Sequence, residues 1–160
     1  MLVSFLDSVK YVGHLVPISF LRIFLGYYYL QSAMMKYTSD FLNKPKIAET
    51  ISEFLPLSQA PEWYKVIVTA QMIPQWQILA FLITGFEFAI AISYLIGYVV
   101  RPVAVLGVLL SLNMIFIMGP AYEDLNKTFL ALHFVMAWIG AGRCLGIDYY
   151  FYKRRRGLWW

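Results

Sequence analysis

Residues 82–102 read LITGFEFAIAISYLIGYVVRP, and this stretch decides how the rest of the chain is interpreted. It is apolar enough to cross a bilayer, which takes roughly 20 residues of helix, yet it carries Glu87 near its middle. A carboxylate at the centre of a bilayer costs at least about 2.5–3.5 kcal/mol. We therefore expect Glu87 to face the interior of a helical bundle, where a partner offsets this cost.

The composition of the whole chain is that of an integral membrane protein. The 160 residues are 61% hydrophobic and 14% charged, whereas soluble domains are nearer 45–50% apolar and about 25% charged. Four of the thirteen basic residues form the run KRRR at 153–156, so no basic face for nucleic acid is predicted. The one cysteine, Cys144, excludes a disulfide or a cysteine-ligated cluster within the chain.

Four stretches are long enough to span a membrane, at about 15–36, 77–100, 102–118 and 128–147. The turn at Arg101 and Pro102 is tight, so the second and third spans must be antiparallel neighbours. Residues 37–76 are too long for a structureless loop and predict short amphipathic helices on the outer membrane surface. The predicted fold is all-α: one domain over residues 1–160, an integral membrane four-helix bundle with a helical insertion between its first two spans.

The distribution of lysine and arginine predicts the orientation. Lys10, Arg101 and the run at 153–156 share one side of such a bundle, while the lysines of the other side are balanced by acidic residues. Because basic residues are enriched on the cytoplasmic side, we expect both termini and the basic tail 148–160 in the cytoplasm.

Five polar side chains fall inside the predicted spans: Arg22, Gln31, Glu87, Asn113 and His133. From the helical rise, Arg22 lies roughly 10 Å and Glu87 roughly 20 Å from the cytoplasmic edge, and Asn113 lies near the depth of Glu87. A Glu87–Arg22 pair forms if Arg22 points outward, and we expect this pair, backed by Asn113. His133 lies nearer the outer surface.

This polar set has two interpretations. In the functional one, Arg22, Gln31, Glu87 and Asn113 bind a quinone head group, and Glu87 and His133 exchange protons with it, because glutamate and histidine are the usual proton-handling groups. In the structural one, Arg22 and Glu87 are an ion pair that fixes helix register. Metal, haem and nucleotide sites are not predicted: the sequence has no HExxH and no glycine-rich phosphate loop, and His14 lies at the opposite surface from His133.

Two stretches resemble the DoxX family. The first is LRIFLGYYYLQSAMMKY, residues 21–37, and the second is a series in family order: Pro74, Phe86-Glu87, Gly97, Arg101 and Asn113. The ending GAGRCLGIDYYFYKRRRG, residues 140–157, is similar to the branch that includes the small DoxD subunit of thiosulfate:quinone oxidoreductase. Phe86 departs from the pattern, since a glycine is common there, and it narrows the space beside Glu87.

The resemblance implies a four-helix protein of a bacterial or archaeal inner membrane that works with a second protein subunit. The DoxD branch implies oxidation of thiosulfate to tetrathionate, with electrons passing to quinone. We therefore expect a lipid-embedded redox subunit that binds quinone. The alternative is a non-catalytic scaffold that docks a redox partner. Either function is compatible with a homo-oligomer. A transporter is the weaker third interpretation, because no internal repeat is visible.

Overall fold

The computed structural model describes residues 10, 13–154 and 157. Four long helices, α2 (Val16–Thr38), α5 (Trp76–Ile96), α6 (Val100–Met118) and α7 (Glu123–Ile139), form most of the fold. The shorter elements are η1 (Gly13–Leu15), α3 (Lys46–Phe54), η2 (Leu55–Leu57), α4 (Glu62–Ile67), the π-helical turn η3 (Val68–Met72), η4 (Pro120–Tyr122), η5 (Ala141–Arg143) and α8 (Asp148–Arg154). The described residues form helices joined by turns and loops and contain no strand, which confirms the all-α prediction for this part of the chain. The end of the predicted tail, at 155–156 and 158–160, lies outside the described residues.

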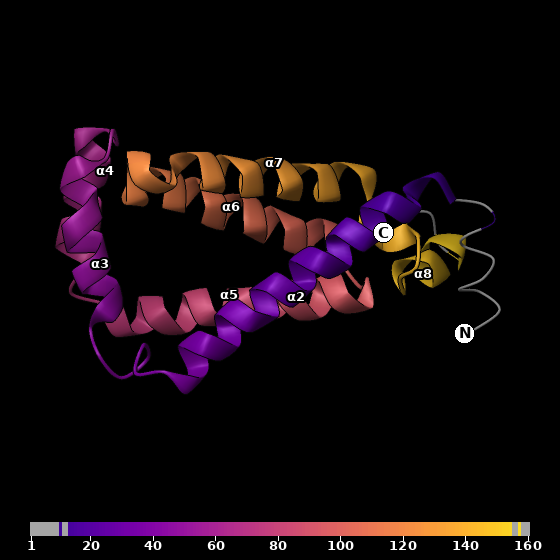
Figure 1. The fold of residues 1–160 in the computed structure, drawn as a ribbon, viewed down its shortest axis with the longest axis horizontal. Helices are drawn as coiled ribbons and strands as arrows, with labels where there is room; N and C mark the ends of the chain where they lie inside the picture. The colour runs from indigo at the N-terminus through magenta and orange to yellow at the C-terminus, as the bar shows by residue number, and fades with distance from the viewer. Residues whose placement is uncertain (1–9, 11–12, 155–156, 158–160) are drawn as a thin grey trace.

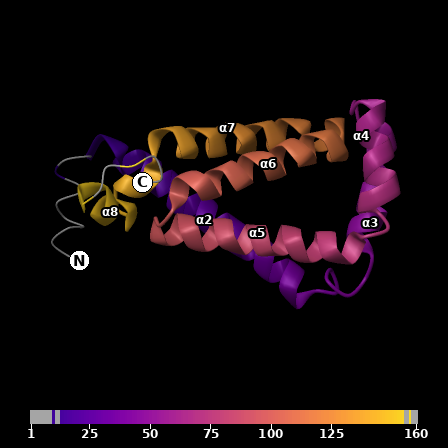
Figure 2. The same cartoon turned by 180° about the vertical axis from the view of Figure 1, so that it is seen from behind.

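The long helices pack as two pairs that diverge from one end. Helix α2 crosses α5, and α6 runs alongside α7. Figures 1 and 2 show the pairs closest together at the end that carries α8, which we call the closed end. At the other end, the wide end, α3 and α4 lie across the opening (Figure 1). Helix α3 buries Ile47 and Ile51 there and contacts both α5 and α6.

Glycines end two of the long helices, and the end of α7 differs from the predicted boundary. Gly97 follows α5 and Gly140 follows α7, each with a φ of +70°. Left-handed glycine is the usual helix terminator, because a side chain is strained there. The helix expected over 128–147 therefore stops at Ile139, and it begins earlier, at Glu123, where two acidic residues favour the positive end of the helix dipole.

Two of the described helices, α5 and α6, are long and apolar enough to cross a membrane. Helix α2 is less apolar because it contains Arg22, Gln31 and three consecutive tyrosines. Helix α7 has 17 residues and opens with a polar turn. By length and hydropathy, the structure thus shows two of the four predicted spans.

The closed end is held by Arg22 of α2. Its side chain is fully buried and donates hydrogen bonds to the carbonyl oxygens of Ala141 (2.9 Å), Cys144 (3.4 Å) and Leu145 (2.8 Å). A Cβ atom at Gly97 would collide with this guanidinium, so glycine is also required there for space. Arg22 thus ties α2 to the segment that follows α7.

Asp148 completes the closed end. Its carboxylate accepts hydrogen bonds from the backbone N–H groups of Val99 (2.7 Å) and Val100 (3.1 Å), at the start of α6. Burial raises the pKa of Asp148, while these two N–H groups and the charge of Arg22 act in the opposite direction. The carboxylate therefore caps α6 from a position distant in sequence.

We expect Asp148→Ala to lower the free energy of unfolding by about 1–2 kcal/mol, because it removes the cap of α6. The measurement is unfolding of the purified protein by titration of mild detergent micelles with SDS. Asp40→Ala is the matched control, since Asp40 is fully exposed and pairs with Lys44 on the surface; it should change stability little. Equal effects of the two substitutions would contradict the capping role.

A candidate functional site between the helix pairs

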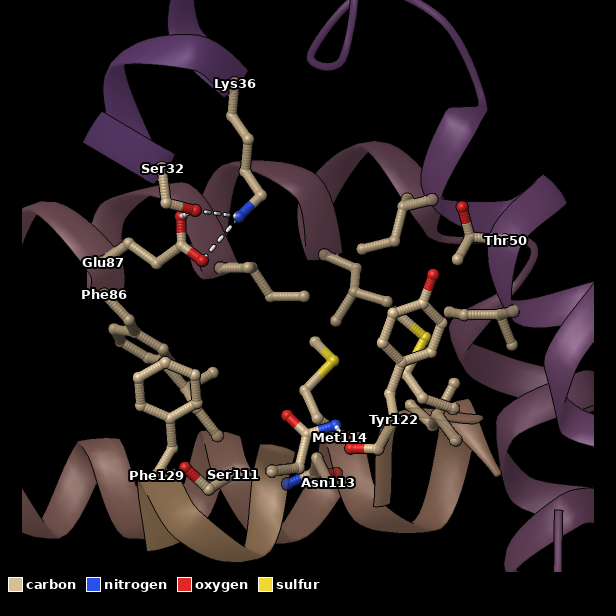
Figure 3. Close-up of a pocket in the computed structure, with 18 of the residues that line it drawn as sticks. Ser32, Lys36, Thr50, Phe86, Glu87, Ser111, Asn113, Met114, Tyr122 and Phe129 are labelled. Atoms are coloured by element: carbon tan, nitrogen blue, oxygen red, sulfur yellow. Dashed lines mark hydrogen bonds and ion pairs between the residues drawn. The ribbon is translucent and has the colours of Figure 1, made fainter. Parts of the chain in front are cut away.

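A cavity of about 500 Å³ lies where the helix pairs diverge. It is bordered by α2, α5, α6 and α7, with α3 at the wide end. Its walls are mainly apolar and include Ile83, Phe86, Leu110, Met114 and Phe129. Polar side chains occupy a few positions, and Figure 3 shows Ser32, Lys36 and Glu87 across the cavity from Ser111 and Asn113. The other polar lining residues include Tyr29, Thr50 and Asn126.

Glu87 is paired with Lys36, not with Arg22. Lys36 Nζ lies 2.5 Å from Glu87 Oε1, and Ser32 donates to Glu87 Oε2 at 3.1 Å. Lys36 also donates to Ser32 Oγ at 3.0 Å, which closes a triangle of hydrogen bonds (Figure 3). The predicted Glu87–Arg22 pair is therefore wrong, because Arg22 is engaged with carbonyl groups at the closed end.

The position of Lys36 explains why its role was missed. It lies near the end of α2, where a lysine is usually expected to extend toward water. Its side chain instead runs back along the helix to Glu87, past Ser32 one turn earlier. Residues four apart share a helix face, so the pattern Ser32–Lys36 was the available signal. The crossing of α2 over α5, which brings this face to Glu87, was not readable from the sequence.

Asn113 lines the cavity but does not contact Glu87. Its Oδ1 accepts a hydrogen bond from the Tyr64 hydroxyl (3.0 Å), and its Nδ2 donates to the Leu109 carbonyl (2.8 Å). Burial raises the pKa of Tyr64, so this hydroxyl stays protonated as a donor. Asn113 thus attaches α4 to α6 at the wide end. Gln31, by contrast, is exposed outside the cavity and donates to the Tyr27 hydroxyl (2.9 Å).

His133 lies behind the cavity wall and not on it. The ring is fully buried, with Nε2 hydrogen-bonded to the Tyr29 hydroxyl and Nδ1 to the Tyr94 hydroxyl, each at 2.7 Å. Of these three residues, Tyr29 lines the cavity. Gly107 of α6 makes room for the ring, because a Cβ atom there would overlap it.

The arrangement suits a lipophilic molecule with a polar head. The apolar walls can enclose rings or an isoprenoid chain, and the polar groups can hydrogen-bond oxygen atoms at fixed places. Lys36 and Ser32 offer hydrogen-bond donors, and the carboxyl group of Glu87 offers acceptor oxygens. No group of three or more His, Cys, Asp or Glu side chains suited to a metal ion occurs within residues 13–154.

Removing either partner of the Lys36–Glu87 pair should destabilise the protein. We expect Lys36→Met to cost about 1–3 kcal/mol of unfolding free energy, less than for a fully enclosed pair because 24% of the Lys36 side chain is exposed. Glu87→Gln in the Lys36→Met background should restore part of this loss, since no unpaired carboxylate then remains. SDS titration of the four proteins gives the coupling energy. Additive effects would contradict a direct pair.

Gly107→Ala tests whether the space beside His133 is filled as described. We expect a loss of about 1–3 kcal/mol from overpacking against the imidazole. Gly85→Ala is the matched control: it lies on the exposed face of α5, and a Cβ atom there meets no other atom within 4 Å. That control should be neutral or stabilising, because alanine favours helix more than glycine. Equal effects in the same SDS titration would contradict the close contact.

Comparison with known proteins identifies the family. The DoxX family model matches residues 18–120, well over half of the chain. The match includes Tyr29, Ser32, Lys36, Glu87 and Asn113 of the cavity, while α7 lies beyond it. Searches of curated proteins and of solved structures find no match. The family and the apolar helices α5 and α6 together indicate a membrane protein. The chain belongs to the DoxX family.

Proposed function

We propose that this protein is the membrane subunit of a redox enzyme and binds a quinone in the cavity between its helix pairs. The observation that carries the proposal is the combination of a cavity of about 500 Å³, mainly apolar walls, and an ion pair set into one wall. This volume falls within the range of roughly 300–1,000 Å³ typical of small-molecule sites.

The chemistry of the walls fits a quinone head group. A quinone carries carbonyl oxygens that accept hydrogen bonds, and Lys36 and Ser32 can donate to one of them. Glu87 can exchange a proton with a reduced quinone, because carboxylates held in apolar surroundings commonly serve this purpose. The apolar surface of Leu82, Ile83 and Phe86 lies next to Glu87 on α5 and can contact the ring or the chain.

We further propose that all four long helices cross a bacterial or archaeal inner membrane as a bundle, with both termini in the cytoplasm. Arg101, Arg143 and Arg154 belong to the closed end, whereas Glu49 and Glu53 lie on α3 at the wide end. Basic residues favour the cytoplasmic side. The 17 residues of α7 reach about 26 Å, so the bilayer would thin slightly around it. In this orientation the cavity lies in the outer half of the membrane.

We base the proposed electron donor and partner on residues 140–157. The similarity of residues 140–157 to the DoxD branch supports thiosulfate as donor and a second protein subunit as partner. The α3–α4 insertion lies across the wide end, next to the cavity. It is the surface on which we expect that subunit to dock.

A non-catalytic scaffold is the second candidate function, and one observation favours it. Lys36, Ser32 and Glu87 already satisfy one another, as a purely structural ion pair would. In that case the cavity holds an acyl chain of a lipid, and the protein positions a redox partner without contacting quinone.

Mass spectrometry of an organic extract of the gently purified protein distinguishes the two functions. We expect near-stoichiometric quinone in the wild type and a several-fold loss in Lys36→Met and in Glu87→Gln, measured on folded material. Lys44→Met is the matched control, because Lys44 is exposed and pairs with Asp40 away from the cavity; it should retain the quinone. Quinone at the level of bulk lipid in the wild type would favour the scaffold.

A further inference from the structure

Two tyrosines hold both nitrogens of His133 in the core. Tyr94 and His133 are fully buried, and Tyr29 is nearly so. The Tyr94 hydroxyl lies 2.7 Å from Nδ1, and the Tyr29 hydroxyl lies 2.7 Å from Nε2. The three side chains come from three helices, α5, α7 and α2. They form a chain of hydrogen bonds that begins in the core and ends at the cavity wall.

The number of protons on the imidazole and the two hydroxyls decides which group donates in each of these hydrogen bonds. A neutral imidazole has one N–H donor and one acceptor nitrogen, and each hydroxyl has one proton. If Nδ1–H donated to Tyr94, the Tyr94 proton would need another acceptor. Within residues 13–154, His133 is the hydrogen-bond partner found for that hydroxyl. A buried hydroxyl proton without an acceptor is costly, so this direction is disfavoured.

The opposite direction leaves every proton with a partner. Tyr94 donates to Nδ1, and Nε2–H donates to the Tyr29 oxygen. The Tyr29 proton then remains for an oxygen of a molecule bound in the cavity, whose lining includes Tyr29. A doubly protonated imidazole would place a charge between two neutral tyrosines in the core, which is costly without a counter-charge.

The space around the ring shows that this arrangement is built into the fold. Gly107 is buried on α6, and a Cβ atom there would overlap His133 at Nδ1, Cε1 and Cγ. The glycine therefore leaves room for the ring at the position where both hydroxyls reach its nitrogens.

We propose that Tyr94, acting through the Nε2–H tautomer of His133, fixes the Tyr29 hydroxyl as a hydrogen-bond donor to a carbonyl oxygen of the molecule in the cavity. Tyr29 is the binding residue, while His133 and Tyr94 are positioning residues. The inference rests on the proposed use of the cavity and adds a specific contact to it. Its ligand class is a lipophilic carbonyl compound, which includes the quinones.

The contact is tested by removing single hydroxyl groups. A short-chain ubiquinone is titrated into the protein in nanodiscs. We expect Tyr29→Phe to raise Kd about three- to tenfold, the effect of one hydrogen bond. Tyr28→Phe is the matched control, because Tyr28 also lines the cavity but is not bonded to His133; its Kd should stay within about twofold. An unchanged Kd in Tyr29→Phe, with the wild type binding, would overturn the proposal.

The positioning role of Tyr94 requires a separate readout. Tyr94→Phe should also raise Kd, yet combining it with Tyr29→Phe should raise Kd no further than Tyr29→Phe alone. Such non-additivity is expected when one residue acts through another. A purely structural Tyr94 would give additive effects on Kd, and that result would overturn the proposed role.

The tautomer is observed directly by nitrogen NMR. The chain has two histidines, His14 and His133, so His14→Gln leaves one labelled imidazole in protein purified through a histidine-free tag. We expect a protonated Nε2 and an unprotonated Nδ1, with this preference weakened in Tyr94→Phe. A protonated Nδ1 would overturn the proposal. This measurement needs no ligand, so failure of the wild type to bind ubiquinone would refute the quinone function, while the tautomer separately tests the hydrogen-bond direction on which the inference rests.

Discussion

A buried guanidinium is the interaction on which the rest of the structure depends. Arg22 is buried, and carbonyl oxygens of residues 141–145 accept its hydrogen bonds. These bonds tie α2 to the segment after α7, and the guanidinium also lies close to Gly97, which follows α5. Because the helix pairs are joined tightly there, they diverge toward the other end, and the cavity occupies the space between them.

The cavity brings together polar groups from several helices. Glu87 contacts Lys36 and Ser32 at its wall, and Tyr29 connects the wall to His133 and Tyr94 behind it. Asn113 holds α4 over the wide end through Tyr64. Each of these contacts joins segments far apart in sequence, so a lipophilic occupant would contact groups positioned by the whole fold.

The sequence predicted the helical class and the family, and it identified Glu87 as a residue that needs a partner. It predicted the wrong partner, because depth along a helix was read from residue number alone. The crossing of α2 over α5 decides which side chain reaches Glu87, and crossing angles depend on packing that no single helix encodes. Likewise, Gly140 ends α7 early, where hydrophobicity alone suggested a longer helix. His133 was predicted as a group that exchanges protons with the bound molecule; the structure places it behind the cavity wall, between two tyrosines that the sequence did not identify as its partners.

The carbonyl partners of Arg22 also constrain how the protein is made. The Arg22 hydrogen bonds reach across 119 to 123 residues of sequence. A chain that emerges from the ribosome from its N-terminus therefore contains α2 long before Ala141 is made. During that interval the guanidinium lacks these carbonyl partners, so water or another molecule must solvate it. The hydrogen bonds of the closed end therefore form only after residues 141–145 are made, and a chain truncated before Ala141 lacks all three carbonyl partners of the guanidinium.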